Sequence, residues 1–181
     1  FRRVLFRSPL KTMVEADETY VGGHKEGKAG RGAAGKSLVA AVVEVDPEKD
    51  TMGRSYLQKI DSPSMKELGS FIRQKVSPGT VVITDGLPSY SFLEAGYQHD
   101  KIIFKEHKKK RELLPKVHIV IANLKMWLRG TFNRYPEKHI QRYLDEFVFR
   151  FNRRWKLENI FDKLLYRCIL TTTITYAELT G

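Results

Sequence analysis

VEADETYVGG (residues 14–23) and VVITDGLPSY (residues 81–90) each predict a strand that carries an aspartate. Residues 14–21 alternate as a strand does, which places Glu15 and Asp17 on one face of the sheet. Residues 81–84 form a short apolar strand of the kind found inside a mixed sheet, and Asp85 follows its last residue. Open α/β sheets bind ligands where such strands end. The two aspartates are therefore candidate site residues, and Glu15 competes with Asp17.

The rest of the chain predicts an α/β domain. Ser64 and Glu67 form a capping box at the start of a helix that Pro78 ends. The expected elements around it are strands at 38–45 and 54–60, a weaker strand at 102–104, and helices at 119–129 and 137–152. We therefore expect a mixed sheet flanked by helices.

A third stretch, HIVIANLKMWLRGTF (residues 118–132), places Asn123 on the first of the two later helices. Two carboxylates from strands and an oxygen ligand from a later helix can hold two Mg²⁺ ions roughly 3.5 to 4 Å apart, one for the attacking oxygen and one for the leaving oxygen. Mg²⁺ prefers such hard oxygen ligands, and Mn²⁺ is its expected substitute. The candidate catalytic and metal-binding residues are Asp17, Asp85 and Asn123.

The third ligand has alternatives. Asn123 lies on the border of the apolar stripe of its helix, and Lys125 and Arg129 lie on the far side, so Lys125 is expected to face away from the metal. The rival carboxylates are Glu15, Glu112 and Glu146, of which Glu146 is expected to pair with Arg150 at i,i+4. His118 can orient water, donate to a phosphate or start the helix, and Asp85 can be a turn residue.

These stretches, with KHIQRYLDEFVFRFNRR (residues 138–154), resemble the catalytic domain of bacterial insertion-sequence transposases of the ISXO2-like group, the IS1595 family. In that group the acidic triad is often Asp, Asp, Asn rather than Asp, Asp, Glu, and this chain has Asn123 at the matching place. The resemblance runs from about residue 13 to residue 154.

The resemblance implies a ribonuclease-H-like fold with three antiparallel strands, then parallel strands, flanking helices and a C-terminal helical extension. It also implies a Mg²⁺-dependent transposase that hydrolyses phosphodiesters and transfers strands of double-stranded DNA, at element ends and target, as a homo-oligomer on DNA in the bacterial cytoplasm at the nucleoid. The expected catalytic domain is residues 9–156, and residues 157–181 are a helical tail.

The net charge of +11 suggests a polyanionic partner. The candidate DNA-binding residues are Lys108, Lys109, Lys110, Arg111, Lys125, Arg129, Arg153 and Arg154. The alternative for the run at 105–111 is a solvated loop, and Trp155, beside the last arginines, can be a core residue.

Residues 1–8, FRRVLFRS, resemble the translation of a sequencing adapter. Without their three arginines the net charge falls from +11 to +8. On this interpretation the gene is truncated upstream, and the end-recognition module that such transposases usually carry is missing. The alternative is a genuine basic N-terminus.

The single cysteine, Cys168, excludes an internal disulfide, fits a reducing compartment and is expected to pack in the core. No apolar run approaches the roughly 18 residues of a membrane span, so we expect no membrane partner.

Two rival functions stay open. GRGAAGKS (residues 30–37) matches the phosphate-binding loop G-x-x-x-x-G-K-[ST], which requires a strand before it and a helix after it and would make the chain a nucleotide hydrolase. The other rival is an inactive DNA-binding remnant of a mobile element.

Overall fold

The computed structural model describes residues 8–22, 36–102, 114–132, 136–155, 158, 160–170 and 175. Five strands form one sheet in the order β3-β2-β1-β4-β5. The strands are β1 (Val14–Val21), β2 (Ser37–Asp46), β3 (Thr51–Ile60), β4 (Val81–Thr84) and β5 (Gln98–Lys101). β1, β2 and β3 pair antiparallel, whereas β4 pairs parallel with β1 and β5 pairs parallel with β4. The predicted mixed sheet is confirmed.

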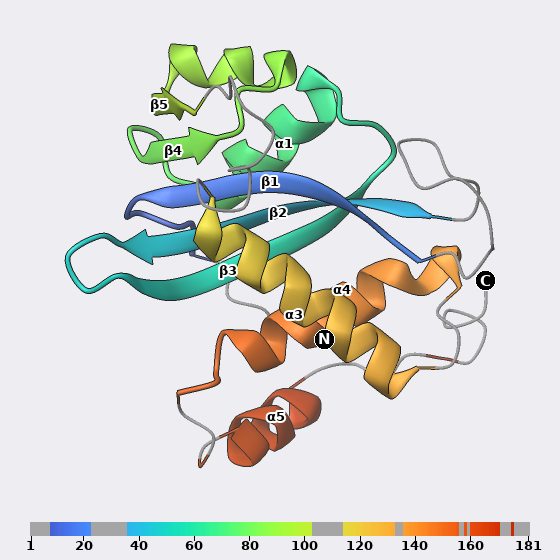
Figure 1. Cartoon of the computed structure of the whole chain (residues 1–181). Helices are drawn as coiled ribbons and strands as arrows, with labels where there is room; N and C mark the ends of the chain where they lie inside the picture. The colour runs from blue at the N-terminus through green and yellow to red at the C-terminus, as the bar shows by residue number, and fades with distance from the viewer. Residues whose placement is uncertain are drawn as a thin grey trace.

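Helices cover both faces of the sheet (Figure 1). The helical elements are α1 (Met65–Lys75), the 3₁₀ helix η1 (Pro88–Ala95), α3 (Pro115–Thr131), the 3₁₀ turn η3 (Glu137–His139), α4 (Ile140–Phe151) and α5 (Ile160–Ile169). α1 and η1 lie on one face, and α3 and α4 lie on the other, with α3 over β1 and β2 and α4 over β3. Because the two central strands are covered on both faces, β2 is buried along almost its whole length.

Local sequence signals explain most element bounds. Ser64 Oγ accepts the backbone N–H of Glu67 at 3.3 Å, so the predicted cap of α1 is confirmed. The fifth strand, β5, ends at Lys101. Of the weaker strand expected at 102–104, residue 102 lies outside any strand and residues 103–104 lie outside the described residues. β5 is an edge strand of mostly exposed polar residues, QHDK, and therefore has no apolar alternation to reveal it.

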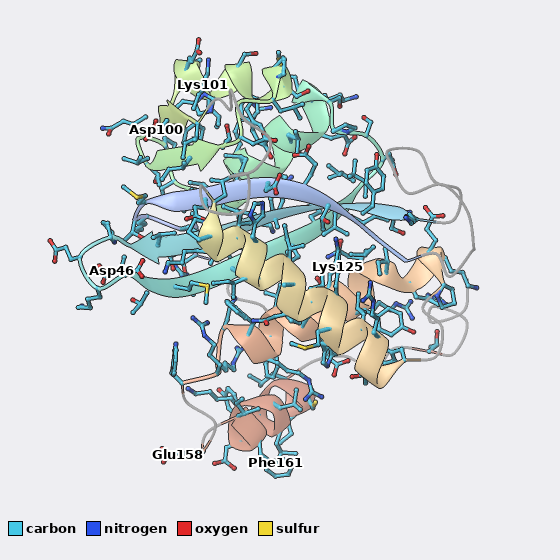
Figure 2. The ribbon with its side chains drawn as sticks, viewed as in Figure 1. Asp46, Asp100, Lys101, Lys125, Glu158 and Phe161 are labelled. Atoms are coloured by element: carbon cyan, nitrogen blue, oxygen red, sulfur yellow. The ribbon has the colours of Figure 1, made fainter. Side chains whose placement is uncertain are left out.

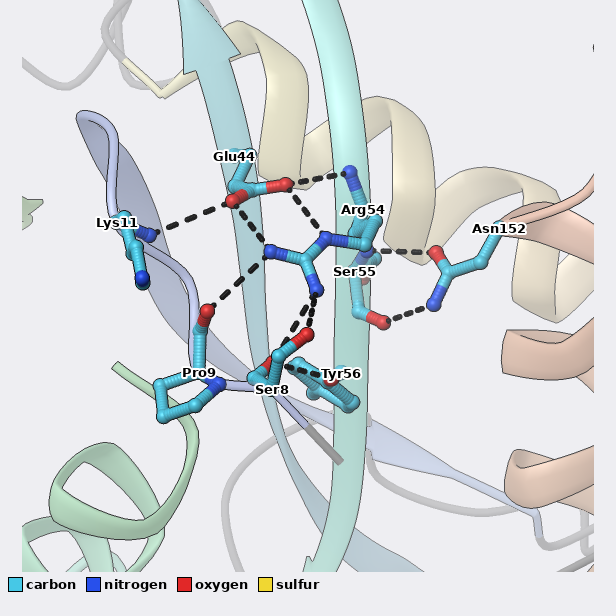
Figure 3. Close-up of polar contacts among 8 residues, drawn as sticks. All are labelled: Ser8, Pro9, Lys11, Glu44, Arg54, Ser55, Tyr56 and Asn152. Carbon is cyan, nitrogen blue, oxygen red and sulfur yellow. Dashed lines mark hydrogen bonds and ion pairs between the residues drawn. The ribbon is translucent and has the colours of Figure 1, made fainter. Parts of the chain in front are cut away.

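An ionic network joins the start of the described chain to the edge of the sheet (Figure 3). Arg54 on β3 forms a bidentate pair with Glu44 on β2, through Nε to Oε2 at 3.1 Å and Nη2 to Oε1 at 3.0 Å. Nη1 of Arg54 also donates to Ser8 Oγ at 2.8 Å, and Nη2 donates to the Pro9 carbonyl at 3.3 Å. The side chains of Arg54 and Glu44 are only 26% and 13% exposed, so this pair is largely desolvated. Loss of the Glu44 carboxylate would leave a partly buried guanidinium without its ion-pair partner.

Glu44→Gln is expected to lower the free energy of unfolding by about 1 to 3 kcal/mol, because it replaces charge-assisted hydrogen bonds to Arg54 by neutral ones in a site with little water. Urea denaturation measures the change, and Glu48→Gln, at an exposed position just beyond β2, is the control. Equal midpoints for the two variants would contradict the role of the pair.

α5 carries large apolar side chains that are exposed in this chain. They are Phe161, Leu165, Tyr166, Ile169 and, just after the helix, Leu170. Figure 2 shows Phe161 on the side of α5 that points away from the sheet.

Cys168 on the same helix is also exposed, so the expectation that it packs in the core is wrong. Among the described residues, no helix is both long and apolar enough to cross a membrane.

Candidate active site

The two predicted aspartates lie on β1 and directly after β4, two strands that pair in parallel. Val14 pairs with Val82 and Glu15 with Ile83. Continuing this register by two residues places Asp17 level with Asp85, which follows the last residue of β4. Side chains at the same level of neighbouring strands point to the same face. The register therefore predicts that both carboxylates lie on the face of the sheet that α3 covers.

Asp17 is held through both carboxylate oxygens. Oδ1 accepts the backbone N–H of Glu18 at 2.9 Å, and Oδ2 lies 3.1 Å from Nε2 of His118 in the first turns of α3. The side chain of Asp17 is 13% exposed and that of His118 is 24% exposed. Asp17 thus lies opposite the N-terminal part of the later helix, as the sequence predicts.

Asp85 begins the turn that leaves β4. Its Oδ1 accepts the backbone N–H of Leu87 at 3.1 Å, and the intervening Gly86 has φ of 77°, a conformation that favours glycine. The alternative role of Asp85 as a turn residue is therefore real. It is compatible with a second role, because an ionised carboxylate has about four lone-pair sites and this turn engages one oxygen.

The Glu15 carboxylate is buried and binds the start of α3. It is only 5% exposed, and its Oε2 accepts the backbone N–H of Val117 at 2.8 Å. α3 has no side-chain cap of its own, because Leu114 precedes it and Pro115 begins it, so the carboxylate on β1 supplies this acceptor. Burial raises the pKa of Glu15, and the hydrogen bonds from the first turn of α3 oppose that rise.

Negative charge gathers on both sides of β1 at this level. The hydroxyl of Tyr90, from η1, donates to Glu18 Oε2 at 3.3 Å on the face opposite α3. Burial raises the pKa of Tyr90 well above its usual value, and the charges of Glu18, Asp17 and Asp85 raise it further. The fully buried phenol of Tyr90 therefore stays protonated, and the negative charges of all three carboxylates disfavour its ionisation.

Lys125 faces the site, contrary to the prediction that it faces away. Its Nζ donates to Thr19 Oγ1 at 2.7 Å, and Thr19 is two residues beyond Asp17 on the same face of β1. Figure 2 shows Lys125 beside α3. Burial lowers the pKa of Lys125, the nearby Arg129 lowers it further, and Asp17 opposes the change. The lysine and Asp17 thus share one electrostatic environment.

Asn123 does not lie on the side of α3 that carries His118 and Lys125. It lies five residues after His118, a rotation of about 140° around a helix of 3.6 residues per turn. Its neighbour on that side, Trp127, packs on Phe147 of α4 with ring centroids 5.8 Å apart. Asn123 is half-buried on the side of α3 towards α4, and its role as a ligand stays a prediction.

Only some of the remaining predicted residues lie in the described part of the chain. Lys108, Lys109, Lys110, Arg111 and Glu112 lie outside the described residues. Glu146 pairs with Arg150 at 2.8 Å, as predicted, and Arg129 is exposed on α3. Sequence patterns could not find the Asp17–His118 contact, since it joins residues 101 positions apart.

Arg153 and Arg154, predicted to bind DNA, are engaged at the end of α4. The Arg153 guanidinium lies 3.9 Å from the Phe149 ring centroid, and that of Arg154 lies 4.0 Å from the Phe151 centroid. Arg154 also donates to the carbonyls of Met52 and Gly53, which joins α4 to the start of β3. Trp155 is 80% exposed, so its alternative role as a core residue is wrong.

The donor set fits a hard divalent cation. Asp17 on β1 and Asp85 directly after β4 offer carboxylate oxygens, and Mg²⁺ is commonly held by one or two carboxylates together with substrate phosphates and water. Within the described part of the chain, no group of three or more His, Cys, Asp and Glu side chains is placed to hold a metal ion. Among the described residues, the two predicted carboxylates, Asp17 and Asp85, are thus not joined by a third His, Cys, Asp or Glu.

The strand order β3-β2-β1-β4-β5, antiparallel and then parallel, with paired aspartates on β1 and after β4, defines a ribonuclease-H-like domain. The model of the ISXO2-like transposase domain matches residues 9–152. The chain belongs to this transposase family.

A chain in the cryo-electron microscopy structure of the simian T-cell lymphotropic virus intasome in complex with PP2A regulatory subunit B56 gamma is similar to this one, with 12% identity and a TM-score of 0.46. The similarity covers 80% of this chain and 49% of that one, so this chain spans about half the length of that relative. A search of curated proteins finds no match.

Proposed function

We propose that this transposase domain cuts DNA and joins its strands by divalent-metal-assisted phosphoryl transfer. The observation that carries the proposal is the level placement of Asp17 and Asp85 on adjacent parallel strands, with the first turns of α3 against Asp17. Mg²⁺, or Mn²⁺ as a substitute, would be held by these two aspartates. When bound, the metal would polarise the phosphate and lower the pKa of an attacking water or 3′-hydroxyl. Asn123 stays the predicted third ligand.

The protein groups have separate tasks in this proposal. Asp17 and Asp85 hold the charge that attracts the cation, and the hydrogen bonds to Asp17 keep its carboxylate in one orientation. Lys125 and Arg129 place positive charge on the same side of α3, where a DNA phosphate can be bound. Double-stranded DNA is therefore the proposed partner, and action as a homo-oligomer on DNA at the nucleoid stays a prediction.

A nucleotide hydrolase is not favoured. A phosphate-binding loop needs a helix directly after its lysine and serine, so that the helix N-terminus meets the phosphates. Ser37, the last residue of the matching motif, begins strand β2 instead. Residues 30–35 of the motif lie outside the described residues.

Metal-dependent nicking separates the active enzyme from an inactive remnant. The 181-residue chain is incubated with supercoiled plasmid in Mg²⁺, Mn²⁺, Ca²⁺ or EDTA, and nicked product is measured on a gel. We expect nicking in Mg²⁺ and Mn²⁺ and none in EDTA, with DNA binding retained in Ca²⁺. Binding without nicking under any metal condition would support the remnant.

Lys125→Ala is expected to weaken DNA binding and to reduce the slope of log affinity against log salt by about one, as the loss of one phosphate contact should. Fluorescence anisotropy at several salt concentrations measures the slope. Lys49→Ala is the control, because Lys49 pairs with Asp46 after β2, away from Asp17. If Lys125 touches no DNA, both variants will keep the parental slope.

A further inference from the structure

The side of α3 that meets the aspartates is marked by a ladder of contacts with β1. Glu15 Oε2 accepts from Val117 N at 2.8 Å, Asp17 Oδ2 lies 3.1 Å from His118 Nε2, and Thr19 Oγ1 accepts from Lys125 Nζ at 2.7 Å. The three β1 residues alternate along the strand and therefore share one face. His118 and Lys125 are seven residues apart, about two turns, and therefore also share one side of the helix.

Asn123 occupies the other side of α3. It is five residues from His118 and two from Lys125, which corresponds to rotations of about 140° and about 160° away from them at 3.6 residues per turn. Trp127, one turn beyond Asn123, contacts both Phe132 and Phe147, so this side of the helix faces the aromatic cluster with α4. For Asn123 to reach Asp17, α3 would have to rotate and break all three contacts with β1.

We propose that His118 is the helix-borne positioning residue of the active site, in the place that the sequence assigns to Asn123. This inference rests on the proposed function. An ionised carboxylate only accepts hydrogen bonds, so His118 Nε2–H donates to Asp17 Oδ2. Together with the Glu18 N–H on Oδ1, this bond fixes the plane of the Asp17 carboxylate. The remaining lone pairs of both oxygens are then held in a fixed direction for a cation.

A histidine donor at this place has a specific consequence for the metal. It orients a ligand without adding a third negative charge, so the affinity for the cation depends on two carboxylates and on their alignment. Groups that orient metal ligands typically contribute about 10- to 100-fold to metal affinity. The contribution of His118 should therefore appear in metal binding itself, before any DNA is cut.

The test is Mn²⁺ binding to the full chain, followed by the electron paramagnetic resonance signal of the free ion. His118→Leu removes the donor and is expected to weaken Mn²⁺ binding by about 10- to 100-fold. His118→Gln, whose terminal amide donates from a similar distance, should stay within a few-fold of the parent. Asn123→Leu, on the opposite side of α3, tests the rival third residue. Met126→Leu, at an exposed position of the same helix, is the matched control and should bind Mn²⁺ like the parent. Circular dichroism melting verifies that each variant is folded.

The outcomes separate the two proposals. If Asn123→Leu weakens Mn²⁺ binding and His118→Leu does not, the positioning role of His118 is overturned and Asn123 is the third residue. If His118→Gln loses as much affinity as His118→Leu, hydrogen-bond donation is overturned. Mn²⁺ bound with this pattern but without nicking would overturn the proposed function alone. No Mn²⁺ binding by the parent would overturn both.

Discussion

Asp17→Asn and Asp85→Asn are each expected to lower the rate of plasmid nicking by about 10³-fold or more. A bound metal stabilises the transition state by several kcal/mol, and each 1.4 kcal/mol, roughly, is a factor of ten in rate. DNA affinity should change little or rise slightly, since the lysines and arginines that attract phosphate are kept. Nicking rates, DNA anisotropy and Mn²⁺ binding, measured on the same preparations, check the three parts.

Asp46→Asn is the matched control for this experiment. Asp46 ends β2 at the β2–β3 hairpin, where it pairs with Lys49 and accepts the N–H groups of Glu48 and Lys49. Figure 2 shows it at the tip of the sheet, away from Lys125. Its nicking rate should equal that of the parent. Activity of Asp17→Asn or Asp85→Asn within a few-fold of this control would remove the aspartates from the mechanism.

Glu15→Ala should damage both the fold and the reaction. It leaves the buried N–H of Val117 without its acceptor, which costs about 1 to 3 kcal/mol of unfolding free energy. It also loosens the start of α3, and a displacement of about 1 Å in a reacting geometry can cost about 10²-fold in rate. Thermal or urea unfolding and the nicking assay measure the two losses.

Glu15→Gln separates the hydrogen bond from the charge. Its carbonyl oxygen can still accept from Val117, and the variant has no ionised group to bury. Because burial raises the pKa of Glu15 above 4.5, the protonated form is favoured in the folded state. The parent therefore loses stability relative to Glu15→Gln as the pH rises through that raised pKa. Equal destabilisation of the Gln and Ala variants at pH 7 would show that the charge, rather than the acceptor, holds α3.

Much of the sheet could be predicted because its buried strands carry apolar or alternating residues that are visible in the sequence. β1 and β4 have the predicted bounds, and Ser64 marks the start of α1. β5 was not predicted because its residues are polar and mostly exposed, and η1 was missed because a 3₁₀ helix lacks the 3.6-residue apolar repeat.

The candidate site was predictable to the extent that it lies on strands. Asp17 and Asp85 follow from alternation and from the end of a strand, and the pairing of β1 with β4 agrees with both. The choice between Asn123 and His118 depends on the rotation of α3 about its axis. The apolar stripe fixes which side is buried, but each flank of that stripe carries a polar candidate, His118 on one and Asn123 on the other. The contacts of Asp17 with His118 and of Thr19 with Lys125 decide which flank faces β1.

The three contacts between β1 and α3 also determine when the proposed active site can form during synthesis. These contacts join residues 102, 101 and 106 positions apart in the chain. A ribosome adds about 5 to 20 residues per second, so α3 follows β1 by roughly 5 to 20 s. During that interval β1, β2, β3 and β4 can pair and bring the aspartates level, while Asp17 still lacks its partner on α3. On the proposed function, competence for DNA chemistry is thus a late event of folding, reached only when α3 docks on the first strand.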